Sequence, residues 1–300
     1  MKNALKRLIR QTLNRFGYEL VLLPKGGVAA SRPDTQALDI SLSLEDRYRH
    51  AVGELGHCQA MRQIHEHDSA EIEALYRKFV FPDLRERTGR AGDLNGLIGT
   101  TVSEGIYIVR ALQETSSLPG DVCEFGVAQG ATTKLIAGEI ISGDKSLWLY
   151  DSFEGLPEPS PEDVLIDDIF KLGSMKDYKG TMRCSKDEVV QRLASLGFPE
   201  ARTNIKVGWV EETAIGPENP YSVSFAYIDF DFYSPILFAL KFVDERMPVG
   251  GQIIVDDYGF FSKGAEQAVT EFMTGRGESY ELLKPLELAG HFVILRKVAA

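Results

Sequence analysis

The stretch CEFGVAQG, residues 123–130, joins an apolar run to an amphipathic one and is the clearest guide to the fold. Glycines at positions 126 and 130 let the backbone turn tightly and come close to a ligand. A helix that begins near Thr132 would direct its unpaired N–H groups at that ligand. This order of strand, glycine turn and helix favours a nucleotide-like cofactor, while a turn that binds nothing would use the same glycines.

The same alternation of apolar and amphipathic segments continues to the end of the chain and predicts an α/β fold. A parallel sheet covered by helices on both faces is typical of this pattern. The predicted strands are residues 121–126, 147–153, 204–210, 225–232 and 252–259, and the predicted helices are 132–142, 187–197, 235–247 and 264–275. Runs 280–288 and 291–298, joined by Ala289 and Gly290, predict an antiparallel hairpin, so the sheet should be Rossmann-like.

The chain is predicted to divide into an N-terminal helical extension, residues 1–96, and an α/β domain, residues 97–300. The extension begins with a basic amphipathic helix at 2–16, continues through a glycine- and proline-rich linker at 24–33, and ends in a charged helical cap. We expect the basic helix to dock on its own protein or on a second subunit of a homo-oligomer. Contact with an anionic membrane surface is the alternative.

Composition excludes several classes of protein. The balance of 33 basic against 44 acidic side chains gives a net charge of -11, which disfavours binding to nucleic acid. Three cysteines without a CxxC pair indicate neither a disulfide framework nor a structural zinc site, and they fit a cytoplasmic protein. A zinc site is conceivable only in the cluster His57, Cys58, His65, His67 and Asp68, whose spacing disfavours it. We expect neither a membrane span nor a cleaved leader.

Asp151 ends the second predicted strand, in the motif YDSFEGLP at residues 150–157. It follows Gly126 by 151 − 126 = 25 residues, close to the spacing at which an acid meets the ribose diol of a nucleotide. The alternative is that Asp151 caps the segment that follows it. The ordered pair of glycine turn and acidic strand end favours the ligand. A nicotinamide cofactor is disfavoured, because GxxxG stands here in place of GxGxxG.

Four aspartates follow two neighbouring predicted strands: Asp229 and Asp231 after one, Asp256 and Asp257 after the next. Carboxyl ends of adjacent parallel strands lie side by side, so these carboxylates can converge. Converging carboxylates repel one another unless a hard divalent cation accepts their oxygens, and a few carboxylates with remaining waters suit magnesium. The alternative is a set of solvated loop acids.

The motifs DVCEFGVAQG, LYDSFEGLPEP, IDFDFYSP and VGGQIIVDDYG, in this order, resemble the macrocin O-methyltransferase family, whose members methylate sugar hydroxyls. The resemblance covers residues 98–298. It implies a seven-stranded methyltransferase fold, S-adenosylmethionine as methyl donor, a magnesium ion and a small hydroxylated acceptor such as a sugar. It also implies Asp229, Asp256 and Asp257 as metal ligands. The implied donor-binding residues are Thr101, Glu124, Gly126, Ala128, Gly130, Thr132, Asp151, Ser152 and Phe153.

The resemblance also bears on the catalytic base. Catechol O-methyltransferases carry a lysine three residues after the first metal aspartate, whereas this chain has Phe232 there. Asp229 is therefore the candidate base. A protein that binds a nucleoside-containing ligand without catalysis is the alternative function, although clustered carboxylates are costly without a task.

The segment at residues 157–178 is longer than an ordinary connection between a strand and a helix. It fits either a lid over the cofactor or a surface insertion in which Asp163, Asp167 and Asp168 need only be solvated. Trp209, after the third strand, could lie on the adenine or pack against a helix.

Overall fold

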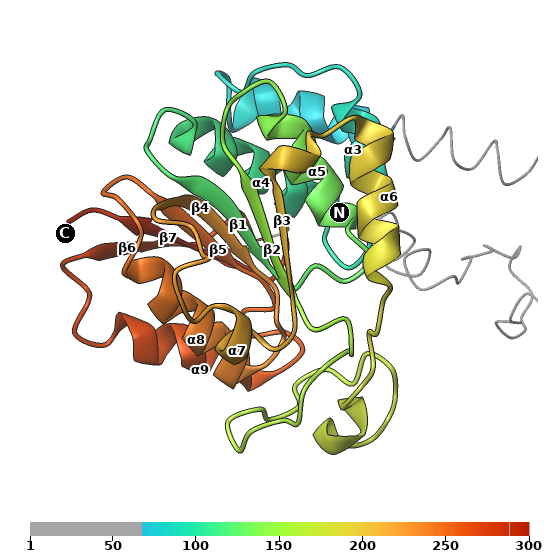
Figure 1. Ribbon diagram of the computed structural model, residues 1–300, viewed down its shortest axis with the longest axis vertical. Helices are drawn as coiled ribbons and strands as arrows, with labels where there is room; N and C mark the ends of the chain where they lie inside the picture. Colours follow the sequence, from blue (N-terminus) through green and yellow to red (C-terminus); the bar gives the residue numbers. More distant parts are fainter. Residues whose placement is uncertain (1–67, 288, 300) are drawn as a thin grey trace, which may run out of the picture. The chain divides into compact units, whose positions relative to one another are not determined.

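A seven-stranded sheet forms the centre of the chain (Figure 1), which the computed structural model describes over residues 68–287 and 289–299. The strand order is β3-β2-β1-β4-β5-β7-β6; β1 to β5 run parallel, and β7 is antiparallel to β5 and β6. The strands are β1 (Asp121–Phe125), β2 (Leu147–Asp151), β3 (Thr203–Val207), β4 (Val223–Ile228), β5 (Gln252–Val255), β6 (Tyr280–Leu283) and β7 (Val293–Lys297). The predicted Rossmann-like sheet with a terminal antiparallel pair is confirmed.

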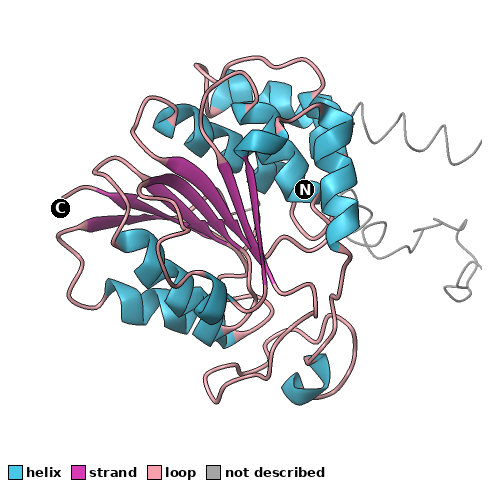
Figure 2. Ribbon diagram, viewed as in Figure 1, coloured by secondary structure: helices cyan, strands magenta, loops and turns pink. Residues whose placement is uncertain are grey.

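Helices cover both faces of the sheet (Figure 2), because successive side chains of each strand point to opposite sides. On β1, Val122 packs into one apolar core, whereas Cys123 and Phe125 pack into the other. The first face carries α3 (Arg90–Asn95), α4 (Val102–Thr115), α5 (Ala131–Ile140) and α6 (Lys186–Leu196); the second carries α7 (Val210–Thr213), α8 (Tyr233–Asp244) and α9 (Lys263–Met273). No helix within the described ranges is both long and apolar enough to cross a membrane.

The predicted strands extend too far at their carboxyl ends, and two of the wrong boundaries have a clear local reason. Strand β3 stops at Val207 because Gly208 adopts a φ of 136°, and Trp209 is then the N-cap residue of α7. The hairpin is looser than expected, since residues 284–292 and not the pair Ala289 and Gly290 connect β6 to β7. Pro285, just after β6, has no N–H to donate and so cannot extend the ladder.

Residues 68–79 are helical, as the sequence predicts. Arg90 ties this segment to α5: its guanidinium donates to both oxygens of Glu139 at 2.8 Å and to Glu73 at 2.7 Å. The side chain of Arg90 is only 2% exposed. The compact unit of the structure begins at Asp68, while the predicted division of the chain at residues 96 and 97 stays a prediction. The predicted basic helix and linker, and the histidines and cysteine of the candidate zinc cluster, lie outside the described residues.

We predict that Arg90→Ala lowers the free energy of unfolding by about 3 kcal/mol, because Glu73 and Oε2 of Glu139 lose a buried ion-pair partner while Arg87 still bonds Oε1 of Glu139. The matched control is Lys241→Ala, which removes an exposed ion pair with Glu271 and should change stability by less than about 1 kcal/mol. Urea denaturation of both variants measures the difference. Equal effects of the two substitutions would contradict a structural role for the buried pair.

Candidate active site

The glycine turn after β1 is shaped by its contact with the loop after β4. Gly126 has a φ of 84°, and a Cβ at this position would lie 1.9 Å from the carbonyl oxygen of Asp229. Gly130, with a φ of 76°, is the N-cap residue of α5. Only glycine allows this approach, so the turn and the first candidate metal ligand are held in direct contact.

Asp151 organises the same turn from the end of β2. Its Oδ2 accepts the backbone N–H groups of Val127 at 2.7 Å and Ala128 at 2.8 Å, and its Oδ1 accepts that of Phe153 at 2.6 Å. The carboxylate therefore fixes both the glycine turn and the start of the next loop. The contact of Asp151 with the motif, expected from the spacing, is present, and its role toward a ribose stays a prediction.

Glu124 lies below the turn and is fully buried. Neither carboxylate oxygen of Glu124 has a hydrogen-bond partner among the described residues. The Thr133 hydroxyl is nearby and acts to lower the pKa of Glu124, but it also makes no hydrogen bond. Burial raises the pKa of Glu124 to about 8. An unpartnered buried acid at a ligand-binding turn suits a ligand that donates N–H groups or carries positive charge.

The other predicted donor-binding side chains lie at the starts of α4 and α5 and in the loop after β2. Thr132 is buried, 3.2 Å from the hydroxyl of Thr100. Thr101 uses its hydroxyl within the protein, since it accepts the N–H of Glu104 and donates to the carbonyl of Ala289. Ser152 and Phe153 follow β2, with the Ser152 hydroxyl accepting from Glu154. Trp209, at the end of β3, is half-buried.

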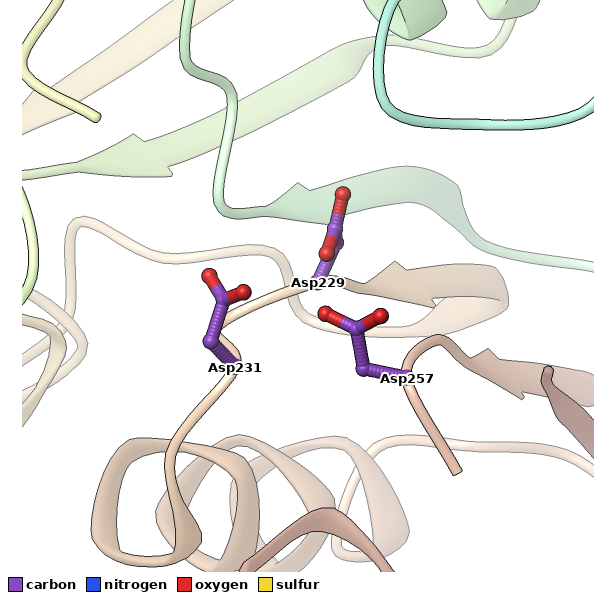
Figure 3. Close-up of side chains that lie close together, drawn as sticks. All are labelled: Asp229, Asp231 and Asp257. Carbon is purple, nitrogen blue, oxygen red and sulfur yellow. The ribbon is translucent and has the colours of Figure 1, made fainter. Parts of the chain in front are cut away.

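Three aspartates gather where β4 and β5 end (Figure 3). Asp229, Asp231 and Asp257 each offer a carboxylate oxygen, and these oxygens all lie within 4.8 Å of one another. The carboxyls are half-buried. Loss of solvation raises the pKa of Asp231 well above its ordinary value, and the charges of Asp257 and Asp229 raise it further. The expected convergence of acids from two strand ends is confirmed.

Asp256 is not one of the three residues in this close group, and its role as a metal ligand stays a prediction. The Asp256 carboxylate accepts the hydroxyl of Tyr227 at 2.8 Å, and Oε1 of Glu104 of α4 lies 3.3 Å from the same hydroxyl. Side chains alternate along β5, so Asp256 points to the same face as Ile254, toward α4. The third member of the close group, beside Asp229 and Asp257, is Asp231 and not the expected Asp256.

Sequence reasoning missed two buried groups near the cluster. Glu104 is only 2% exposed, and burial together with the neighbouring Asp256 raises its pKa well above the ordinary value. Asp163, expected to be solvated, is 5% exposed and bonds to the loops that follow the acids. Glu104 stands three residues after Thr101, the spacing of a capping box. This spacing predicts an acid that bonds the backbone at the start of the helix, so it gives no sign that Glu104 is buried.

The segment between β2 and α6, residues 152–185, lies beyond the strand ends (Figure 1) and packs on these acid-bearing loops. Its side chains Leu156 and Tyr178 share a small core with Phe232 and Phe261. The backbone also pairs there, since Ile166 donates to the carbonyl of Phe261 at 3.0 Å. Whether it opens as a lid stays a prediction.

The sheet order, the glycine turn and the acids at the strand ends together define a Rossmann-like methyltransferase fold. Residues 105–289 match the family described as Macrocin-O-methyltransferase (TylF). The chain therefore belongs to the macrocin O-methyltransferase family, and the resemblance seen in its motifs is confirmed.

Individual relatives agree with this assignment. The chain is 28% identical over 188 residues to a Streptomyces olivaceus 8-demethyl-8-(2,3-dimethoxy-alpha-L-rhamnosyl)-tetracenomycin-C 4'-O-methyltransferase, covering 61% of this chain and 68% of that one. It is 26% identical over 171 residues to the mycinamicin III 3''-O-methyltransferase of Micromonospora griseorubida, covering 56% and 65%. The solved O-methyltransferase NovP shares the fold, with a TM-score of 0.57 at 21% identity over 77% of this chain and 100% of that one.

The raised pKa of Glu124 predicts how stability depends on pH. The unfolded carboxyl ionises near its ordinary value of 4.5 and the folded one at about 8, so between these values the folded state holds the extra proton. Stability should fall as pH rises through this window, by about 1.4 kcal/mol per pH unit, and level off above it. Glu124→Gln, measured without added donor, should remove this slope. Denaturation curves from pH 5 to pH 8.5 test it, and parallel curves for both proteins would refute it.

Proposed function

We propose that the chain transfers a methyl group from S-adenosylmethionine to a hydroxyl of a sugar or a glycosylated small molecule, with help from a divalent cation. One observation carries the proposal: the glycine turn suited to the donor touches the loop that carries the acids, at Gly126 and Asp229. A donor in that turn would lie beside the acid cluster. The name of the Streptomyces olivaceus relative specifies a rhamnosyl-bearing acceptor, which supports the sugar.

The residues around the turn fit such a donor. Gly126 and Gly130 give the turn its left-handed backbone, with φ values of 84° and 76°, and α5 begins directly after it, where unpaired N–H groups suit a ligand with negative charge. Glu124 offers buried oxygens to a group that donates hydrogen bonds or carries positive charge. We propose that Asp151, Ser152 and Phe153 hold the nucleoside part, as the motifs imply.

The acid cluster fits a hard divalent cation. Oxygen ligands from Asp229, Asp231 and Asp257 lie close enough together to share one ion, and burial together with repulsion from Asp257 and Asp229 raises the pKa of Asp231, a cost that an ion would offset. Asp256, the other predicted ligand, accepts the Tyr227 hydroxyl through Oδ2. A bound magnesium ion would lower the pKa of an acceptor hydroxyl and help to orient it.

We propose that the chain's own part in proton transfer falls to Asp229. Its backbone is fixed on both sides, because its N–H donates to Phe125 at 2.7 Å and its carbonyl rests against Gly126. A carboxylate on such a rigid support can be aimed at one acceptor hydroxyl, which is the geometric requirement for a general base. The residue three positions after Asp229, where catechol enzymes carry a lysine, is the buried Phe232, so no lysine is available there as a base.

Asp229→Asn should reduce methyl transfer by at least about a hundredfold, because the amide cannot accept the proton. Donor binding should persist, since Asn keeps the shape of the side chain and the Gly126 contact involves only backbone. Labelled S-adenosylmethionine with a panel of glycosylated acceptors measures turnover, and calorimetry measures donor affinity. Near-normal turnover in this variant would exclude Asp229 as the base.

Cation binding should appear as a gain in stability that one substitution in the cluster removes. Mn²⁺ at a hundred times its Kd should stabilise the wild type by about 2.7 kcal/mol. Asp257→Asn should lose this gain, yet without cation it should be at least as stable as the wild type, because one repelling charge is gone and Asn tolerates the φ of 55°. Thermal denaturation with and without Mn²⁺ measures both effects, with the exposed Asp177→Asn as control.

Equal gains from Mn²⁺ in the wild type and in Asp257→Asn would show that the ion binds elsewhere. Methyl transfer that continues undiminished in excess EDTA would likewise contradict the cation, while leaving the donor site intact.

A further inference from the structure

Asp163 is a buried carboxylate outside the acid cluster. Its oxygens accept hydrogen bonds from three segments of the chain. Oδ2 accepts the N–H and the hydroxyl of Ser160, both at 2.8 Å. Oδ1 accepts the N–H of Tyr233 at 2.8 Å and the hydroxyl of Ser262 at 3.3 Å. A carboxylate with both oxygens bonded in this way is held in one orientation.

The partners of Oδ1 stand at the starts of two helices. Tyr233 is the first residue of α8, two residues after Asp231. Ser262 is the N-cap of α9, five residues after Asp257, and its hydroxyl accepts the N–H of Gly264. One carboxylate therefore joins the far ends of both acid-bearing loops.

The fit around Asp163 is too close for any side chain at Gly264. A Cβ there would lie 2.0 Å from Oδ1 of Asp163 and 2.7 Å from the nitrogen of Tyr233. Gly264 belongs to α9, where alanine would otherwise be the better helix former. The glycine is thus explained by the contact with Asp163 and not by the needs of the helix.

The acids themselves need such support. Asp231 and Asp257 adopt left-handed backbone conformations, with φ values of 61° and 55°. Residues other than glycine pay a free-energy cost in this region, and they stay there only when surrounding contacts hold them. The bonds from Asp163 act just beyond each of these two strained residues.

We propose that Asp163 is a positioning residue that holds the loops after β4 and β5 in register, so that their carboxylates stay close enough to share one cation. This inference rests on the proposed cation site. Asp163 itself contacts neither the donor turn nor the cluster, and it acts through the backbone of Tyr233 and the hydroxyl of Ser262. The long segment between β2 and α6 thereby becomes part of the support of the site.

The test compares Mn²⁺ affinity of full-length variants by electron paramagnetic resonance. Asp163→Asn replaces one acceptor oxygen by a donor and should weaken Mn²⁺ binding about ten- to hundredfold, the effect typical of lost outer-sphere support. Asp167→Asn, an exposed residue of the same segment with the same change of charge, should leave the affinity unchanged. Gly264→Ala should weaken binding like Asp163→Asn, although helix propensity favours alanine.

The double variant should bind Mn²⁺ no more weakly than either single one, because both changes break the same contact. If Asp163→Asn does not fold, Gly264→Ala carries the test. Wild-type affinity in folded Gly264→Ala or Asp163→Asn would overturn the inference, and so would an equal loss in Asp167→Asn. A wild type that binds no Mn²⁺ would instead refute the cation site itself.

Discussion

The arrangement of this site depends on the crowding of carboxylates at the ends of β4 and β5. Asp229, Asp231 and Asp257 bring oxygens within 4.8 Å of one another, and Asp256 and Glu104 lie behind them. Like charges at such distances in a partly desolvated place are costly unless a proton or a cation compensates. Besides this repulsion, Asp231 and Asp257 have strained left-handed backbone conformations. Local destabilisation of this kind is common where a protein performs chemistry.

The rest of the fold brings the glycine turn after β1 to the same edge of the sheet. Parallel strands end side by side, so the turn after β1 and the loop after β4 become neighbours, and Gly126 allows them to touch. Asp151 and Asp163 then fix the neighbouring loops with buried hydrogen bonds. Residues 105–289, which match the macrocin O-methyltransferase family, contain both this glycine turn and the acid cluster.

The order of elements was predictable because apolar strands and amphipathic helices differ in period, and the acids were predictable because they directly follow apolar runs. Orientation was harder to predict. Asp256 and Asp257 are adjacent, yet strand alternation turns Asp256 toward Tyr227 while a left-handed backbone turns Asp257 to the cluster. Asp163 could not be recognised at all, since its partners at Tyr233 and Ser262 are 70 and 99 residues away and only the folded chain unites them.

The central claim is that these crowded acids exist to hold one cation beside the methyl donor. A crystal structure of the full chain grown with Mn²⁺ and S-adenosylmethionine, with anomalous data collected at the manganese edge, tests this most directly. We predict a single strong anomalous peak coordinated by carboxylate oxygens of Asp229 and Asp257, next to the turn at Gly126. Donor density in that turn without any anomalous peak at the acids would contradict the claim.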